Sequence, residues 1–362
     1  MNKIVLFAFS CTAFFINAQE ELTDKEKRYQ DSIAALNQSS AVVAAAQEAY
    51  NSGISLFEAK KYTEALAKFS EAVGKDSTFQ EAHYNKGLTL IELKKNEEAV
   101  ECFDRLISIN KSHNKALFQK GKAYQNMSFY QDAVSAYQAS IAIDSKFLKA
   151  HYNLGTAYFL LNEFEKAAQS FTKAIELDPT FYDAYNDRGS CYRQMKNYTS
   201  ALNDYKKAAG INPNLAFIHN NIGTTQRLLK DYEAARDAYT RALSIDPKFY
   251  LAYNNRGVMS MELGKYQDAI KDFDKAIEIN KNYAPAYNNR GSAKHKLQQY
   301  TDAVKDFDKA IAINSEYASA YVNRGISKEM ARDEAGACED WAKARELGSN
   351  EGKEYQVNNC SF

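Results

Sequence analysis

The sequence has little that interrupts helices and no excess of either charge. Only 4 prolines occur among 362 residues, and 46 Lys and Arg residues are balanced by 46 Asp and Glu residues. Few prolines over this length favour helices with short connections. The balanced charge removes the electrostatic reason to expect a nucleic acid or an anionic membrane as the main partner. Hydrophobic residues make up 45% of the chain, enough for a large core, so a disordered chain is excluded.

Long apolar runs are missing except at the start of the chain. Lys3 is followed by an apolar stretch from Ile4 to Ile16, and Ala18 offers a cleavage point. This layout predicts a secretory signal peptide over residues 1–18, because the stretch is short for a membrane span. A lipid-modified Cys11 is the alternative. We expect export to a bacterial periplasm or the medium, with no integral membrane segment after cleavage.

The motifs of metal, redox and catalytic sites are also missing. None of the five cysteines has CxxC spacing, and no P-loop, GxGxxG or nucleophile-elbow pattern occurs. Titratable residues do not cluster, so we predict no catalytic residue, no metal site, no cofactor and no enzyme activity. Cys338 and Cys360 lie 22 residues apart near the C-terminus. In an exported protein, they are candidates for a disulfide that joins the last helices.

What the sequence does contain is an internal repeat with a period of about 34 residues. Glycine recurs at one constant interval, and positions are counted below from the glycine of each unit. The glycines are Gly53, Gly87, Gly121, Gly155, Gly189, Gly223, Gly257, Gly291 and Gly325. Position +12 is always alanine, from Ala65 to Ala337, and position +16 is always aromatic, from Phe69 to Trp341. No insertion or deletion interrupts the series.

Each unit has the pattern of two amphipathic helices. In the unit from Leu148 to Phe181, two apolar stripes at helical spacing flank a polar break near Asn162 and Glu163. Small residues at the glycine and alanine positions allow two antiparallel helices to approach closely, and the aromatic residue fills the wedge between neighbouring hairpins. Asp178-Pro179 is expected to end the second helix.

The unit resembles the tetratricopeptide repeat in its small, aromatic and proline positions and in its period. Nine units cover residues 46–351, with starts at 46, 80, 114, 148, 182, 216, 250, 284 and 318. The resemblance implies an all-α, right-handed superhelical solenoid of antiparallel helix hairpins, whose concave groove commonly binds peptides or protein segments. Residues 19–45 are expected to form an N-terminal arm or a leading helix. Residues 352–362 are expected to form a C-terminal cap or tail.

One position of the first helix carries a polar side chain in every unit. Position −2 holds Asn51, Asn85, Gln119, Asn153, Asp187, Asn221, Asn255, Asn289 and Asn323. Helix propensity does not explain asparagine here. An amide can donate to and accept from the main chain of any peptide, and some tetratricopeptide proteins use such an asparagine ladder in their groove. The alternative is a structural role, with bonds between adjacent repeats.

The remaining groove positions carry an uneven distribution of charge. The middle units place Lys115, Lys122 and Lys149 on the predicted inner face, and Arg193 and Arg227 lie one residue from that stripe. The first units instead carry Glu58, Glu81 and Glu92. This pattern favours an extended peptide with acidic and apolar side chains in the middle of the groove. A solvated surface of mixed charge is the alternative.

Position −1 predicts a set of ion pairs. It is arginine in four units, and the same four units have aspartate at position +15. The pairs are Arg188 with Asp204, Arg256 with Asp272, Arg290 with Asp306, and Arg324 with Asp340. We expect each pair to join the two helices of a hairpin, in a structural role.

The sequence therefore predicts an exported scaffold that binds a protein or peptide in its groove. It leaves the oligomeric state open. A structural or assembly component of the cell envelope, acting through its convex face or termini, is the competing class. A weaker one captures glycan on Tyr84, Phe118 and Tyr152, which share position −3.

Overall fold

The structure, a computed structural model, describes the backbone of residues 8–360 and side chains from residue 25 onward. Over this range the chain forms nineteen helices and no strand. It divides into two compact units, one up to Leu161 and one from Asn162 onward, which are described separately. The predicted signal peptide over residues 1–18, including Cys11, lies outside the residues with described side chains.

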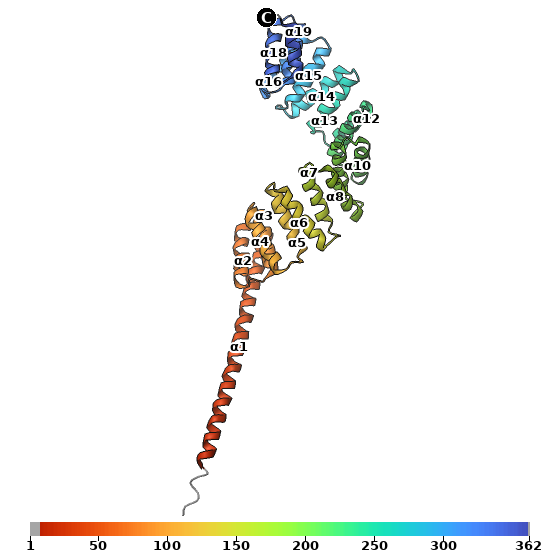
Figure 1. The fold of residues 1–362 in the computed structure, drawn as a ribbon. Coiled ribbons are helices and arrows are strands. Elements are labelled where there is room, and N and C mark those ends of the chain that lie inside the picture. The colour runs from red at the N-terminus through yellow and green to blue at the C-terminus, as the bar shows by residue number, and fades with distance from the viewer. Residues whose placement is uncertain (1–7, 361–362) are drawn as a thin grey trace, which may run out of the picture. The chain divides into compact units, whose positions relative to one another are not determined.

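In both units each helix packs against the next one along the chain (Figure 1). The first unit contains α1 (Ala8–Glu58), α2 (Tyr62–Lys75), α3 (Gln80–Glu92), α4 (Asn96–Ile109), α5 (Asn114–Asn126), α6 (Tyr130–Ile143) and α7 (Leu148–Leu160). The second contains α8 (Phe164–Leu177), α9 (Tyr182–Gln194), α10 (Tyr198–Ile211), α11 (Ala216–Leu228), α12 (Tyr232–Ile245), α13 (Tyr250–Glu262), α14 (Tyr266–Ile279), α15 (Ala284–Lys296), α16 (Tyr300–Ile313), α17 (Ala318–Met330), α18 (Glu334–Glu346) and α19 (Asn350–Asn359). The predicted all-α fold of stacked helix hairpins is confirmed within each unit.

A contact between glycine and an aromatic ring closes the hairpins. A Cβ built on Gly257 would lie 2.6 Å from the ring of Phe273, and one built on Gly53 would lie 2.6 Å from the ring of Phe69. The ring therefore occupies the space that a side chain at the glycine would need. Phe273 also shares a buried cluster with Ala293 of the next hairpin. The aromatic residue thus packs against its own glycine and against the following repeat, not only in the wedge between repeats.

Two kinds of turn set the register. Within a hairpin, the residue at position +7 has a positive φ, from 59° at Lys60 to 72° at Gly264. Between hairpins, Asp or Asn at position +23 accepts a hydrogen bond from the backbone N–H two residues later, as Asp178 does from Thr180 at 2.8 Å. This Asx turn also occurs at Asn280, where no proline follows. The carboxylate or amide, rather than the proline, is the common feature that ends the second helix.

The two ends of the chain differ. At the N-terminal end, the stretch before the first hairpin is part of the continuous helix α1, and Tyr29 and Leu36 on it are 67% and 68% exposed. At the other end, α19 packs on α18 with the rings of Trp341 and Tyr355 stacked 5.1 Å apart. Cys360, just after α19, forms a disulfide with Cys338 of α18. No helix in the described range is long and apolar enough to cross a membrane.

The glycine–aromatic contact gives a first prediction. Gly257→Ala places a methyl group against the buried ring of Phe273, so overpacking is expected to lower the free energy of unfolding by about 1–3 kcal/mol. The better helix propensity of alanine, about 1 kcal/mol, only partly offsets this loss. Urea denaturation followed by circular dichroism measures the change.

Gly210→Ala is the matched control, because a Cβ at Gly210 in α10 meets nothing within 4 Å. This change is expected to raise the free energy of unfolding by up to about 1 kcal/mol. Equal stabilisation by both substitutions would show that the ring does not require the glycine.

The disulfide gives a second prediction. Its cysteines lie 22 residues apart, so Cys338→Ser with Cys360→Ser is expected to cost about 3 kcal/mol, by the loop-entropy relation. In the unreduced, denatured protein a thiol reagent should label the peptides with Cys102 and Cys191, which are free in the structure, but not those with Cys338 and Cys360. Labelling of all four peptides by mass spectrometry would contradict the pairing.

Candidate functional site

The first helices of successive hairpins form one face of each unit. They contact one another directly: α3 touches α1 and α5, α5 touches α7, and in the second unit α13 touches α11 and α15, and α15 touches α17. These helices are therefore the more closely spaced row, and they lie on the inner side of each unit. We call this row the first-helix face, and the opposite row the second-helix face.

Side-chain amides join the first helices of the second unit. The amide nitrogen at position −2 of one repeat donates a hydrogen bond to the side-chain oxygen at position −3 of the preceding repeat. The bonds run from Asn221 to Asn186 (3.0 Å), from Asn255 to Asn220 (3.1 Å), from Asn289 to Asn254 (3.0 Å) and from Asn323 to Asn288 (3.0 Å). We call this series the amide ladder. Asn186 also donates to Asp187 (2.9 Å), which extends the ladder within a repeat.

In the first unit tyrosine hydroxyls replace the asparagine acceptors. Asn85 donates to the hydroxyl of Tyr50 at 3.0 Å, and Gln119 donates to that of Tyr84 at 3.5 Å. Other side chains at position −2 bond within their own helix: Asn153 donates to the carbonyl of Lys149, and Asn51 accepts from Gln47.

Of the position −3 aromatic residues, Phe118 is buried, whereas Tyr84 and Tyr152 are half-buried. Phe118, at this position, is 6% exposed and packs against Tyr137 and Phe147. A buried ring cannot stack on a sugar, which argues against the glycan alternative at Phe118.

The ladder gives position −2 the structural role that the sequence left as an alternative. It does not use the whole bonding capacity of each amide, which has two N–H donors and an oxygen that accepts two bonds. Most position −2 side chains are half-buried, and Asn51 is exposed. A row of partly accessible polar side chains, which are amides in every repeat except the one with Asp187, therefore follows the first helices in each unit.

The predicted cationic residues fall into two groups that belong to different units. Lys115, Lys122 and Lys149 lie on α5 and α7, where Lys122 is half-buried and the other two are exposed. Arg193 and Arg227 lie on α9 and α11 of the second unit. The guanidinium of Arg193 lies 6.0 Å from the centre of the Tyr205 ring. The predicted cationic residues thus form one row in each unit.

The predicted ion pairs between position −1 and position +15 are confirmed. Arg188 binds both carboxylate oxygens of Asp204, at 2.7 and 2.8 Å. Arg256, Arg290 and Arg324 bind Asp272, Asp306 and Asp340 in the same bidentate manner. Each pair joins the two helices of one hairpin, as expected.

Each of these arginines also reaches the preceding hairpin, which the sequence analysis missed. Arg290 of α15 donates to Asp274 of α14 at 2.6 Å, and Arg188 of α9 donates to Thr172 of α8 at 2.9 Å. Burial opposes the charge of Arg290, but hydrogen bonds with Asp306 and Asp274 raise the pKa of its guanidinium above the usual value. We call this three-helix arrangement the arginine clasp. The sequence does contain a signal for the contact with the preceding hairpin, because Thr or Asp occupies position +17 of the unit before each of the four arginines.

The other polar residues in the repeats have structural environments. His83, His151 and His219 share position −4. The Nε2 atom of each lies within hydrogen-bonding distance of the backbone carbonyl oxygen six residues earlier, at 3.0, 2.9 and 3.1 Å respectively. Burial raises the pKa of the Cys102 thiol to about 11 and that of Cys191 to about 12. Within the range that the structure describes, no group of three His, Cys, Asp or Glu residues could hold a metal ion.

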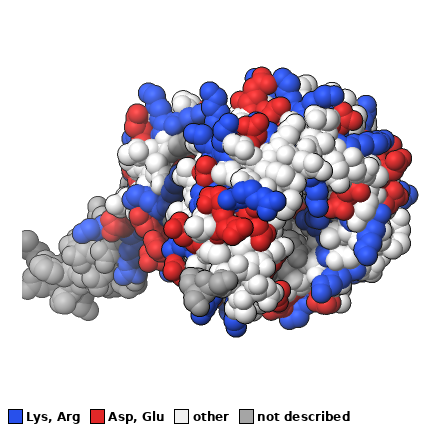
Figure 2. All heavy atoms as spheres, turned by 90° about the horizontal axis from the view of Figure 1, so that it is seen from above, with Lys and Arg blue, Asp and Glu red and all other residues white. Residues whose placement is uncertain are grey.

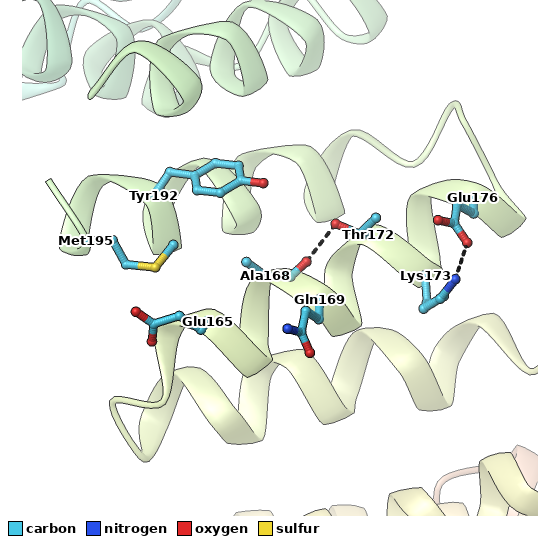
Figure 3. A pocket seen from close by; sticks show the side chains of 8 residues that line it. All are labelled: Glu165, Ala168, Gln169, Thr172, Lys173, Glu176, Tyr192 and Met195. Atoms are coloured by element: carbon cyan, nitrogen blue, oxygen red, sulfur yellow. Dashed lines mark hydrogen bonds and ion pairs between the residues drawn. The ribbon is translucent and has the colours of Figure 1, made fainter. Parts of the chain in front are cut away.

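Shallow pockets occur on the second-helix side of the second unit. One, of about 380 Å³, is lined by residues of α8, by Tyr192 of α9 and by Met195, which follows α9 (Figure 3). Its charged residues Lys173 and Glu176 bind each other at 2.7 Å. Another, of about 740 Å³, lies over α12, α13 and α14 beside the Arg256 clasp. On the face drawn in Figure 2, side chains of both signs are interspersed.

The comparisons with known families agree with this geometry. Models of the tetratricopeptide repeat match residues 25–78, 56–120, 148–181, 181–248, 250–283 and 284–317, and together these ranges cover most of the chain. No curated protein sequence matches the chain.

Several solved structures share the fold. A tetratricopeptide repeat protein from Parabacteroides merdae is 20% identical, with a TM-score of 0.53 over 71% of this chain and 98% of that one. PilW, described as a type IV pilus biogenesis factor, is 22% identical, with a TM-score of 0.52 over 57% of this chain and 97% of its own. The APC/C hetero-tetramer Cut9-Hcn1 matches over 88% of this chain and 84% of its own, with 13% identity and a TM-score of 0.52. At these identities the likeness concerns the fold alone.

The clasp gives a third prediction. Asp306→Ala removes the carboxylate that binds both Arg290 and Lys294, and it leaves two partly buried cations without that partner. We expect the free energy of unfolding to fall by about 3 kcal/mol. Chemical denaturation measures the loss.

Asp302→Ala is its control on the same helix, because Asp302 is exposed and binds only Lys305, at 2.9 Å, among the described ion pairs. This change should stay within about 1 kcal/mol. Similar losses for both variants would contradict a special role of the clasp.

Proposed function

Because the chain belongs to the tetratricopeptide repeat family, we propose that it is a non-catalytic scaffold that binds an extended peptide or protein segment along its first-helix face. The observation that carries this proposal is the row of polar side chains at position −2 on the more closely spaced helices. These side chains are amides in all repeats but the one with Asp187, and all but that of Asn51 are half-buried. Fold class alone would not assign the face.

The position −2 side chains have the hydrogen-bonding groups needed to bind the main chain of a peptide. A peptide in extended conformation presents N–H and C=O groups along its whole length, and an amide can both donate and accept. In the ladder, Asn221 and Asn255 each use one N–H on the preceding repeat. The second N–H and the remaining lone pairs are the groups that would contact the peptide. The ladder also fixes the orientation of each amide, which reduces the entropy lost on binding.

Export is part of the same proposal. It is supported by the layout of residues 1–18 and by the disulfide between Cys338 and Cys360, since disulfides persist in oxidising compartments. A protein of the bacterial periplasm or of the medium fits both features.

A component of the cell envelope that acts through its second-helix face or its termini is the competing function. The observation in its favour is the leading part of α1, where Tyr29, Leu36 and Val43 are 67%, 68% and 56% exposed. Apolar side chains in such a position are typical of surfaces that meet another protein. The two functions differ in the face that a partner would cover.

The fourth prediction separates them. The double variant Asn221→Ala with Asn255→Ala removes two position −2 amides, and we expect it to capture at least about 10-fold less peptide, because hydrogen bonds of this kind each contribute on the order of 1 kcal/mol. The probe is a displayed library of random dodecapeptides selected on the purified protein. Affinities of the selected peptides are measured by fluorescence anisotropy.

The control is Asn186→Ala with Asn220→Ala, which breaks the same two inter-repeat bonds from the acceptor side and keeps both position −2 amides. Peptide binding that falls only in the first variant supports direct contact. An equal fall in both shows that the amides act through repeat geometry alone. Binding that is unchanged in both places the partner on another face and overturns the proposal.

A further inference from the structure

Two arginines of the second unit differ from the four arginines of the clasps. Arg193 of α9 and Arg227 of α11 both occupy position +4, one repeat apart. The clasp arginines all bind carboxylates, as Arg188 does at 2.7 Å. Among the described side chains, neither Arg193 nor Arg227 has a carboxylate within 4.0 Å. The chain therefore gives each position −1 arginine a carboxylate and gives these two arginines phenols instead: Arg193 lies against the ring of Tyr205, and Arg227 is hydrogen-bonded to Tyr239.

The two arginines lie on the first-helix face. Positions −3, +1 and +4 follow one another by steps of four and three residues, so they share one side of a helix. Position −3 carries the ladder acceptor Asn186, to which Asn221 of α11 donates. Arg193 lies two helical turns beyond Asn186, roughly 10 Å along α9. The ladder thus fixes α9 and α11 side by side, with the arginines on the face that it follows.

Buried tyrosines give the arginines a defined floor. The hydroxyl of Tyr205 shares a hydrogen bond with Ser190 at 3.0 Å, and that of Tyr239 shares one with Thr224 at 3.2 Å. Burial raises the pKa of Tyr239, whereas its hydrogen bonds with Thr224 and Arg227 and the charges of Arg227 and Arg193 act to lower it. Both guanidinium groups therefore act on the same phenol, although they come from different helices.

This arrangement leaves guanidinium donors that no carboxylate of the described part of the protein occupies. Two like charges repel when they act on one site, and a partly buried guanidinium has five donors that need acceptors. Arg193 is half-buried against the Tyr205 ring, so water reaches it from one side only. A carboxylate offers two oxygens in the geometry that guanidinium groups bind best.

We propose that Arg193 and Arg227 form a paired site for the carboxylate of an aspartate or glutamate side chain in an extended peptide bound along α9 and α11. The site rests on the peptide-binding function proposed above, and it specifies the chemistry of the partner. Tyr205 and Tyr239 are fully buried and share hydrogen bonds with Ser190 and Thr224, so they support the arginines from below and do not contact the peptide. The amide ladder contributes contacts that do not depend on sequence, and the arginine pair selects acidic segments.

The experiment uses the same random dodecapeptide library, selected on the wild-type protein and on Arg193→Gln with Arg227→Gln. We expect aspartate and glutamate to be enriched on the wild type and not on the variant. A selected peptide should lose about 10-fold or more in affinity when its acidic residue becomes the amide, and a similar amount when the arginines are replaced. These two losses should not add, because they remove the same contact.

The matched control is Lys271→Gln with Lys275→Gln on α14. It also removes two positive charges, but from exposed lysines that bind Asp268 and Glu278. Acid enrichment should survive this change. Arg193→Lys with Arg227→Lys keeps the charge but not the planar donors, so it should restore affinity only in part. Should the double glutamine variant unfold, Arg227→Gln alone carries the test, because Arg227 is exposed.

The outcomes separate this inference from the function on which it rests. Selection of peptides without acidic enrichment, lost in the Asn221 and Asn255 variant, would keep the peptide scaffold and overturn the carboxylate site. Acid enrichment that persists without the arginines, or that the lysine control removes equally, would also overturn it. Failure of the wild type to select any peptide would overturn both proposals.

Discussion

The structure depends on one steric constraint, the placement of a large ring where the glycine lacks a side chain. Phe273 fills this space at Gly257, and the same contact recurs at Gly223 with Tyr239. A single hairpin cannot bury both sides of that ring, so the next repeat must supply the rest, as Ala293 does for Phe273. This shared burial explains why the repeats stack and why the constant period allows no insertion within a helix.

Hairpin packing leaves two faces with different electrostatic designs. On the second-helix side, each clasp arginine ties three helices together through carboxylates or hydroxyls, as Arg290 does with Asp306 and Asp274. On the first-helix side, amides join the repeats, and their bonds are neutral. Because amides carry no charge, the ladder does not neutralise the charged side chains that lie on the same face. Arg193 and Arg227 can therefore act on a ligand, while Arg290 is already neutralised by its own hairpins.

The sequence predicted best where two positions carried complementary chemistry in the same repeats. The pairing of Arg256 with Asp272 followed from such a match, and the structure contains it. It predicted less well where a residue type has several uses. An asparagine has the same bonding groups whether it binds a peptide or another side chain such as Asn220. Which of these partners it binds depends on the distance between neighbouring helices. Asn280 likewise ends a helix through a local turn that no proline marks.

The ladder links the stability of the repeats to the recognition that we propose. Each amide has two donors, and the ladder assigns one of them to the preceding repeat, as Asn289 does with Asn254. A peptide that binds the other donor meets an amide whose direction is already fixed, so binding and stacking reinforce each other instead of competing. A peptide that required both donors would have to break the ladder and would separate neighbouring first helices. The face should therefore favour thin, extended segments, because a bulky helix would hold its own backbone groups away from these amides.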